Sequence, residues 1–211
     1  IANLLNPIEK TIKNRLIPAL TGITPVSETL REVFSLSPKN GGLGLLNPVE
    51  AADTEYTCSK EINEDLIEAI VVNSLDQFLP NISKISKAKL KCKKMKTEQE
   101  QQKKFSILSS CGEELGRQIA LASEKGASSW LTSLPLKSYG FTLSKQQFHD
   151  SVKLRYNIKL DDISGDCACG NKNSVDHSLI CKLGGYTSLR HNHLRDTLMN
   201  LVEVVCKDVV R

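Results

Sequence analysis

The chain has 211 residues, is 40% hydrophobic and 25% charged, and carries a formal net charge of +4 at pH 7. This composition is typical of a globular protein with one large or two small domains. No apolar run approaches the roughly 18 residues that a membrane-spanning helix needs, so we expect no membrane partner. The seven cysteines are odd in number and unevenly spaced. They therefore give no disulfide framework, and we expect an intracellular location, nuclear or cytoplasmic.

The first 50 residues predict two helices and a tight turn. Asn6-Pro7-Ile8-Glu9 places a cap residue, a proline and a glutamate at the start of a helix that should run to about Leu16. A second short helix is expected from Ser27 to Phe34. The stretch Gly41-Gly42-Leu43-Gly44 meets neither phosphate-loop template, because it lacks the third glycine, a preceding strand and a following Gly-Lys-Ser/Thr. It predicts a turn with positive φ angles.

Residues 51–126 predict mainly helical structure with one strongly basic stretch. A broad apolar face over residues 62–78 indicates a core helix that ends at Pro80. Between Lys84 and Lys104 the only acidic residues are Glu98 and Glu100, which gives a local charge of +7. The lysines of this stretch are Lys84, Lys87, Lys89, Lys91, Lys93, Lys94, Lys96, Lys103 and Lys104.

Such a concentrated positive charge is what phosphate contact requires, and it suggests nucleic-acid binding through Lys87, Lys91 and Lys94. A solvated helix face or a lysine-rich linker is the alternative interpretation. From Phe105 to Ala122 a helical apolar stripe resumes, with Gly126 as its expected stop.

The stretch before residue 166 offers two weaker candidates for function. Trp130 could stack on a base, although a single tryptophan among leucines is more often part of a core. A helix should begin at Ser144 and run through Tyr156. Asp161-Asp162 has no further acid, base or metal ligand nearby in the sequence, so we interpret it as a solvated turn rather than a catalytic pair.

The most informative stretch is D-C-A-C-G-N-K-N-S-V-D-H-S-L-I-C, in which Cys167, Cys169, His177 and Cys181 follow a C-x-C-x7-H-x3-C pattern. Tetrahedral zinc needs two close ligand pairs brought together by a reversal of the chain, and residues 170–174 have turn chemistry. If Ser174 caps a short helix, His177 and Cys181 lie on one face of it.

Three thiolates and one imidazole would fill all four positions around zinc, so the expected Zn²⁺ is structural rather than catalytic. Three buried free cysteines and a surface histidine are the alternative. The fold class that follows is mainly α, a helical array with a small zinc knuckle, formed by a short hairpin plus a helix, near the C-terminus.

Basic residues also follow the knuckle, and the helix after Gly184-Gly185 should present them to an anion at its N-terminus. His191 and His193 could instead be spare zinc ligands, but the four-ligand set is complete without them. The candidate nucleic-acid contacts in this part are Lys182, Arg190, His191, Asn192 and Arg195.

Four motifs together carry a resemblance to a known family. Residues 38–48 read P-x-x-G-G-L-G-L-x-N-P and residues 126–136 read G-A-S-S-W-L-x-x-L-P-L, ahead of the knuckle and Arg190-His191-Asn192. This order resembles the region downstream of the polymerase core in LINE-like non-LTR retrotransposon proteins. In that family a reverse transcriptase is followed by a CCHC knuckle and a restriction-enzyme-like endonuclease. The chain also begins and ends inside expected helices, which suggests a fragment of such a polyprotein.

The resemblance implies four segments and a function. Residues 1–57 would flank a polymerase thumb, 58–126 would be a helical linker with the basic helix, 127–188 would hold a helix and the knuckle, and 189–211 would open a truncated nuclease-like domain. The polymerase signature Tyr/Phe-x-Asp-Asp and the nuclease carboxylates and lysine are absent from the sequence. We therefore expect a segment that catalyses nothing itself, although its parent would be an RNA-directed DNA polymerase and endonuclease.

Three classes of function follow. The first is binding of template or target nucleic acid, RNA or DNA, without a small-molecule substrate. The second is a zinc-stapled helical scaffold for protein interaction, in which the lysine helix is only solvated. The third, an enzyme acting on nucleic acid, would need converging carboxylates, and the sequence shows none.

Overall fold

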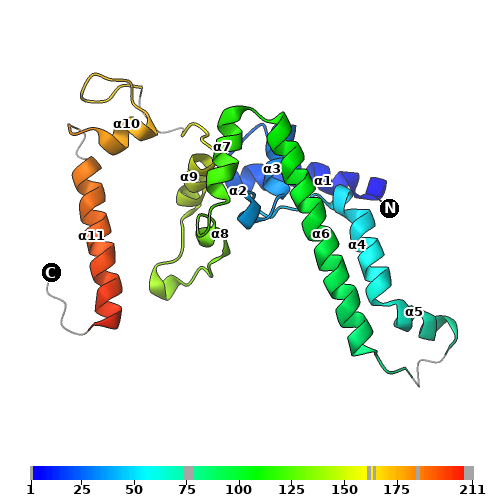
Figure 1. Ribbon diagram of the computed structural model, residues 1–211. Helices are drawn as coiled ribbons and strands as arrows, with labels where there is room; N and C mark the ends of the chain where they lie inside the picture. Colours follow the sequence, from blue (N-terminus) through cyan, green and yellow to red (C-terminus); the bar gives the residue numbers. More distant parts are fainter. Residues whose placement is uncertain (1, 74–77, 161–162, 164, 184–185, 207–211) are drawn as a thin grey trace. The chain divides into compact units, whose positions relative to one another are not determined.

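The computed structural model describes residues 2–73, 78–160, 163, 165–183 and 186–206. The chain divides into two compact units, Ile1–Lys159 and Leu160–Arg211 (Figure 1). The described residues are mainly helical and contain no β-strand, only one antiparallel bridge between Asp166 and Lys172. This confirms the predicted fold class. The division into four functional segments stays a prediction. Among the described helices, none combines the length and the apolar character needed to cross a membrane.

The first unit opens with a helical run that is longer than predicted. It comprises η1 (Ala2–Leu5), α1 (Asn6–Thr11), the π-helical turn η2 (Ile12–Leu16) and α2 (Ile17–Thr21). Pro18 cannot donate a backbone hydrogen bond, and the wider η2 turn directly before α2 accommodates it without ending the helix. The run stops at Gly22, whose φ angle is 67°.

The second helix and the glycine turn form as predicted. In α3 (Glu28–Ser35), the Ser27 hydroxyl accepts a hydrogen bond from the Leu30 amide at 3.2 Å. After η3 (Pro38–Asn40), Gly41 and Gly44 have φ angles of 93° and 75°. At Gly42 an added Cβ would lie 2.0 Å from the Leu36 carbonyl oxygen. The glycines therefore serve a tight backbone turn rather than a phosphate.

The prediction of a core helix over residues 62–78 is wrong for its described part, and residues 74–77 lie outside the described residues. The chain forms α4 (Pro48–Ile62) and then the short α5 (Glu64–Val71), with Asn63 between them. Ala69 is the buried residue of α5, whereas Ile70 and Val71 are 55% and 80% exposed. Periodicity indicates an apolar face, but it does not determine how much of that face other elements cover.

The basic stretch lies in one long helix, α6 (Ile82–Ser110), which packs against α4 (Figure 1). The stripe predicted from Phe105 to Ala122 is broken, because Cys111 and Gly112 have extended backbones with ψ angles of 157° and 155°. The chain then continues as α7 (Glu113–Ala122), α8 (Ser129–Thr132) and η5 (Lys137–Tyr139). A capping box of Ser144 and Gln147 opens α9 (Lys145–Arg155), as the sequence predicted.

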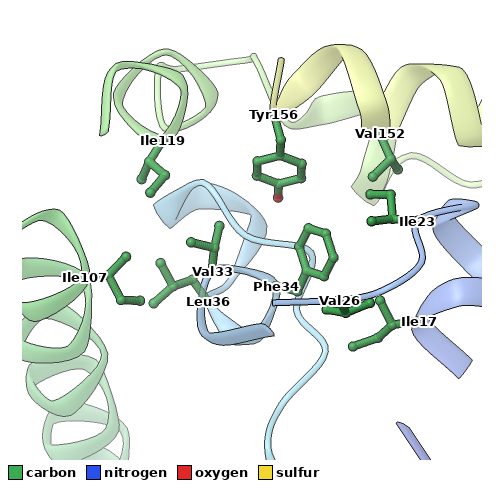
Figure 2. Close-up of a cluster of buried hydrophobic side chains, with 10 residues drawn as sticks. All are labelled: Ile17, Ile23, Val26, Val33, Phe34, Leu36, Ile107, Ile119, Val152 and Tyr156. Atoms are coloured by element: carbon green, nitrogen blue, oxygen red, sulfur yellow. The ribbon is translucent and has the colours of Figure 1, made fainter. Parts of the chain in front are cut away.

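Apolar side chains from α2, α3, α6, α7 and α9 meet in one cluster, drawn in Figure 2. Phe34 and Tyr156 lie at its centre with ring centroids 5.2 Å apart, and the Tyr156 hydroxyl donates to the Gly41 carbonyl at 2.9 Å. Trp130 packs against the cluster, edge-on to Phe148. The core interpretation of Trp130 is therefore confirmed. Burial of this apolar surface is the main stabilising term for the first unit.

Two arginines tie the glycine turn to the rest of the unit. Arg31 is 3% exposed, pairs with both carboxylate oxygens of Glu9 at 2.6 and 2.7 Å, and donates to the Leu45 carbonyl. The Arg155 guanidinium donates to the Ser128 hydroxyl at 2.7 Å and to the carbonyl of Pro38. These guanidinium groups donate to backbone carbonyls that apolar packing alone would leave without hydrogen-bond partners. They therefore fix the turn in place.

Candidate metal centre

The second unit begins with a tight hairpin that carries two cysteines. The Cys167 amide donates to the Asn171 carbonyl at 2.9 Å, and the Gly170 amide donates to the Cys167 carbonyl at 2.8 Å. Gly170 has a φ angle of 85°, which a residue without a Cβ adopts at no cost. This turn places Cys167 and Cys169 on the same side of the hairpin's end, as the predicted chain reversal requires.

The other two candidate ligands come from the short helix α10 (Val175–Ile180). The Ser174 hydroxyl caps the helix by accepting from the His177 amide at 3.0 Å. Cys181 follows as the C-terminal cap residue, and its amide donates to the His177 carbonyl at 2.9 Å. His177 and Cys181 are therefore one helical turn apart, which confirms the predicted cap and spacing.

The hairpin and α10 bring all four side chains to one point. The Sγ atoms of Cys167 and Cys181 are 3.6 Å apart, and Cys169 Sγ is 3.2 Å from His177 Nε2. All four ligand atoms lie within 4.8 Å of one another. Cys181 is buried and the other three are half-buried. A single metal ion could therefore contact all four residues.

The backbone around the cluster affects the charge of its thiols. The Asn171 amide points at Cys169 and lowers the pKa of that thiol, and the Asn171 side-chain amide also reaches Cys169 Sγ at 3.5 Å. For Cys167 the backbone contact with Cys169 lowers the pKa, but burial and the neighbouring cysteines outweigh it and the net shift is upward. The site thus favours a thiolate at Cys169 first, and thiolates are the form that binds metals.

Sequence reasoning missed the two asparagines that organise the loop. Asn171 acts on Cys169, and the Asn173 side chain accepts from the Ser178 hydroxyl at 2.7 Å, which ties the hairpin to α10. Both lie in the stretch read only as turn chemistry. Their signal was the preference of asparagine for local side-chain hydrogen bonds, which marks turns without naming the partner.

The remaining cysteines lie apart from this cluster. Among the described residues, the one group of cysteine, histidine and carboxylate side chains close enough to share an ion is the predicted set. Cys58 and Cys92 are buried in the first unit, Cys111 ends α6 and Cys206 follows the last helix. His191 and His193, the alternative ligands that the complete set made unnecessary, are also outside the group.

The lysines of α6 are less available than their number suggested. Lys91 pairs with Glu61 at 2.6 Å and Lys96 pairs with Glu55 at 2.7 Å, both across to α4, and these contacts raise the pKa of each lysine. Similar ion pairs join Lys84 to Glu64 and Asp65, Lys94 to Glu98, and Lys103 to Glu50. Within the part of the chain that the structure describes, these pairs leave out four lysines: Lys87, Lys89 and Lys93, which are exposed, and Lys104, which is half-buried and donates to the Ser123 hydroxyl.

The basic residues after the knuckle are not gathered at a helix N-terminus, and that prediction is wrong. The helix α11 (Tyr186–Val205) begins four residues before Arg190, so the amides of Arg190, His191 and Asn192 lie inside it. Arg190 and Arg195 are five positions apart, about 140° around the helix axis, and flank an apolar stripe. Lys182 is exposed, and the Gly184-Gly185 hinge and Asp161-Asp162 lie outside the described residues.

The fold and the site define a mainly helical protein with a Cys₃His group that can hold a metal ion. Comparison of the chain with protein-family models, with curated proteins and with solved structures gave no match. The site's own geometry therefore carries the functional argument.

Proposed function

We propose that the Cys₃His cluster binds one structural zinc ion. Zinc held tetrahedrally by thiolates at about 2.3 Å and an imidazole at about 2.1 Å places neighbouring ligand atoms about 3.6 to 3.8 Å apart. The contact of 3.6 Å between Cys167 and Cys181 fits that size, and the contact of 3.2 Å between Cys169 and His177 is somewhat shorter. Three sulfurs and one nitrogen favour zinc over magnesium or calcium, which prefer oxygen ligands.

With four protein ligands the ion has no open position for water, so its role is to fold the loop. Of the described residues 160–206, only Cys181 is buried. A segment without an apolar core needs another source of stability, and metal binding supplies it in small domains of this kind. This convergence of four ligands is the observation that carries the proposal.

We further propose that the chain is a nucleic-acid-binding segment of a LINE-like retrotransposon protein that binds template or target strands. The support is the order of motifs in the sequence together with the exposed lysines of α6. Lys87 keeps its predicted role as a phosphate contact. Lys89 and Lys93 replace Lys91 and Lys94 as the other proposed contacts, because Lys91 and Lys94 already pair with carboxylates. On α11, Arg190 is exposed and Arg195 pairs with Asp196 at 2.8 Å.

A salt titration of binding tests this role. Affinity for an RNA or DNA oligonucleotide should fall steeply with salt concentration, because each neutralised phosphate releases counterions. Lys87→Ala, Lys89→Ala and Lys93→Ala should each weaken binding and reduce the salt slope by about one contact. Lys103→Ala is the matched control, because Lys103 lies on the same helix and pairs with Glu50. Equal effects of all four changes would contradict the assignment.

The structure also supports a second candidate, a zinc-stapled scaffold for protein interaction. On α11, Leu194, Leu198 and Leu201 share one face and are 58%, 60% and 58% exposed. Contiguous exposed apolar surface of this kind is characteristic of protein contacts. If the protein binds no nucleic acid even at low salt, the scaffold function is the correct one.

A further inference from the structure

A second pair of cysteines lies far from the knuckle in sequence, in the first unit. Cys58 is on α4 and Cys92 is on α6, and the two helices pack against each other. Both residues are buried, at 2% and 4% exposed, and both line a cavity of about 500 Å³ between the helices. Neither belongs to the metal-binding group.

The helix pairing places the two thiols opposite each other, because ion pairs join α4 and α6 on either side of them. The neighbouring Cys92 side chain, followed by burial, raises the pKa of the Cys58 thiol to about 11. Cys58 therefore keeps its proton at neutral pH. The basic side chains of Lys89, Lys93 and Lys96 line the same cavity, and Lys96 acts on Cys58 in the opposite, pKa-lowering direction. Two opposed thiols that line one cavity can be joined when a small oxidant reaches them there.

We propose that Cys58 and Cys92 are a redox-active dithiol that a hydroperoxide, such as hydrogen peroxide, oxidises to a disulfide bond between α4 and α6. A small peroxide fits the cavity, and the pairing of α4 with α6 places the two cysteines opposite each other. This proposal does not rest on the nucleic-acid or zinc function.

The reaction balances in two steps. The Cys92 thiolate attacks one peroxide oxygen, which breaks the O–O bond, gives a sulfenic acid and releases hydroxide that takes up the proton lost by Cys92. The Cys58 sulfur then attacks the sulfenic sulfur, the S–O bond breaks, and the departing hydroxide takes the Cys58 proton. Two thiols are oxidised by two electrons to one disulfide, and one peroxide is reduced to two waters.

The cross-link would fix the long basic helix covalently to α4. The ion pairs Lys96–Glu55 and Lys91–Glu61 join the same two helices on either side of the cysteine pair. The pairing of α4 with α6 now depends on packing and on exposed ion pairs. Oxidation would therefore make it more resistant to opening. Reduction of the disulfide would remove this restraint.

The test is peptide mapping by mass spectrometry of the full-length, zinc-loaded protein after treatment with hydrogen peroxide. The expected product is a peptide pair joined through Cys58 and Cys92 that has lost the mass of two hydrogen atoms, with a higher thermal midpoint that falls back on addition of a reductant. Cys58→Ser and Cys92→Ser should each abolish the product, whereas Cys111→Ser, at the end of the same α6 helix, should leave it unchanged.

The mapping of the unaltered protein decides the question even if a variant fails to fold. Separate sulfinic acids at Cys58 and Cys92 without a cross-link would overturn the proposal. So would unmodified Cys58 and Cys92 in a sample whose knuckle cysteines are already oxidised.

Discussion

Different interactions stabilise each of the two units of the chain. In the first unit, Phe34 and Tyr156 lie at the centre of a buried cluster of apolar side chains that several helices contribute. In the second unit, the described part of the knuckle buries one side chain, Cys181, and its order depends on backbone turns and on four converging ligands. The first unit can fold by excluding water, whereas under the proposed function the knuckle takes its stability from a bound ion.

This contrast means that one unit should respond to changes that leave the other untouched. Removal of metal acts on ligands that lie only in the second unit, and substitution of core residues acts only on the first.

Metal removal should have the largest effect. A strong chelator should abolish the protection of residues 165–183 from amide hydrogen exchange, because apparent zinc-binding energies of about 10 to 16 kcal/mol in small domains are folding energy. The thermal midpoint of the first unit should stay within error of its starting value. Lower pH should have the same effect as chelation, because protons compete with the metal for the thiolates.

Cys169→Ser should reproduce metal loss, and Cys111→Ser is its matched control. If chelation lowered the midpoint of the first unit as much as it disordered the knuckle, the units would not be independent.

Gly42→Ala should destabilise the first unit strongly, on the order of 4 kcal/mol, in the extreme range of single substitutions. Its Cβ would meet the backbone oxygens of Leu36 at 2.0 Å and of Val33 at 2.6 Å, and backbone atoms in a packed turn cannot move aside as a flexible side chain can. Chemical denaturation monitored by circular dichroism measures the loss, and zinc content should not change.

Gly112→Ala provides the comparison, since nothing lies within 4 Å of a Cβ there and the cost should stay below about 1 kcal/mol. Similar costs at the two glycines would show that the turn at Gly42 is looser than its contacts indicate.

Tyr156→Phe should have the smallest effect, about 1 kcal/mol at neutral pH, because it removes the hydrogen bond to the Gly41 carbonyl and retains the ring. Burial raises the pKa of Tyr156 from 10.0 to about 12. The folded state therefore holds its proton more tightly than the unfolded state, and this stability is present below pH 10 and is lost as pH rises through 12. Between these values the unfolding free energy of the unaltered protein should fall more steeply than that of Tyr156→Phe. Parallel pH profiles would contradict this.

Local signals in the sequence were sufficient for the knuckle. Cys167 and Cys169 come just before the glycine of a turn, and Ser174 caps a helix that carries His177. All the sequence signals for the metal site therefore lie within fifteen residues. The short range of these contacts is why the sequence predicted the ligands and their spacing. The same holds for the Ser144 capping box and the Gly41-Gly42 turn.

Long-range contacts were not predictable in this way. Lys91 pairs with Glu61 and Lys96 pairs with Glu55, and both carboxylates lie on another helix. No local sequence pattern indicates such a pair. The apolar face of α5 had the period of a core helix, but burial depends on which elements pack against it, which periodicity does not contain. The early start of α11 at Tyr186 was missed because the glycines before it suggested a longer loop.

The most direct test of the account is to determine the metal content and the metal's ligands in the purified full-length chain. Elemental analysis combined with X-ray absorption at the zinc edge measures both the number of ions per chain and the atoms that surround them. The account predicts one zinc per chain, with three sulfurs at about 2.3 Å and one nitrogen at about 2.1 Å, and loss of this signal in Cys169→Ser. A protein without metal whose Cys167, Cys169 and Cys181 react freely with thiol reagents while residues 165–183 stay protected from hydrogen exchange would contradict it.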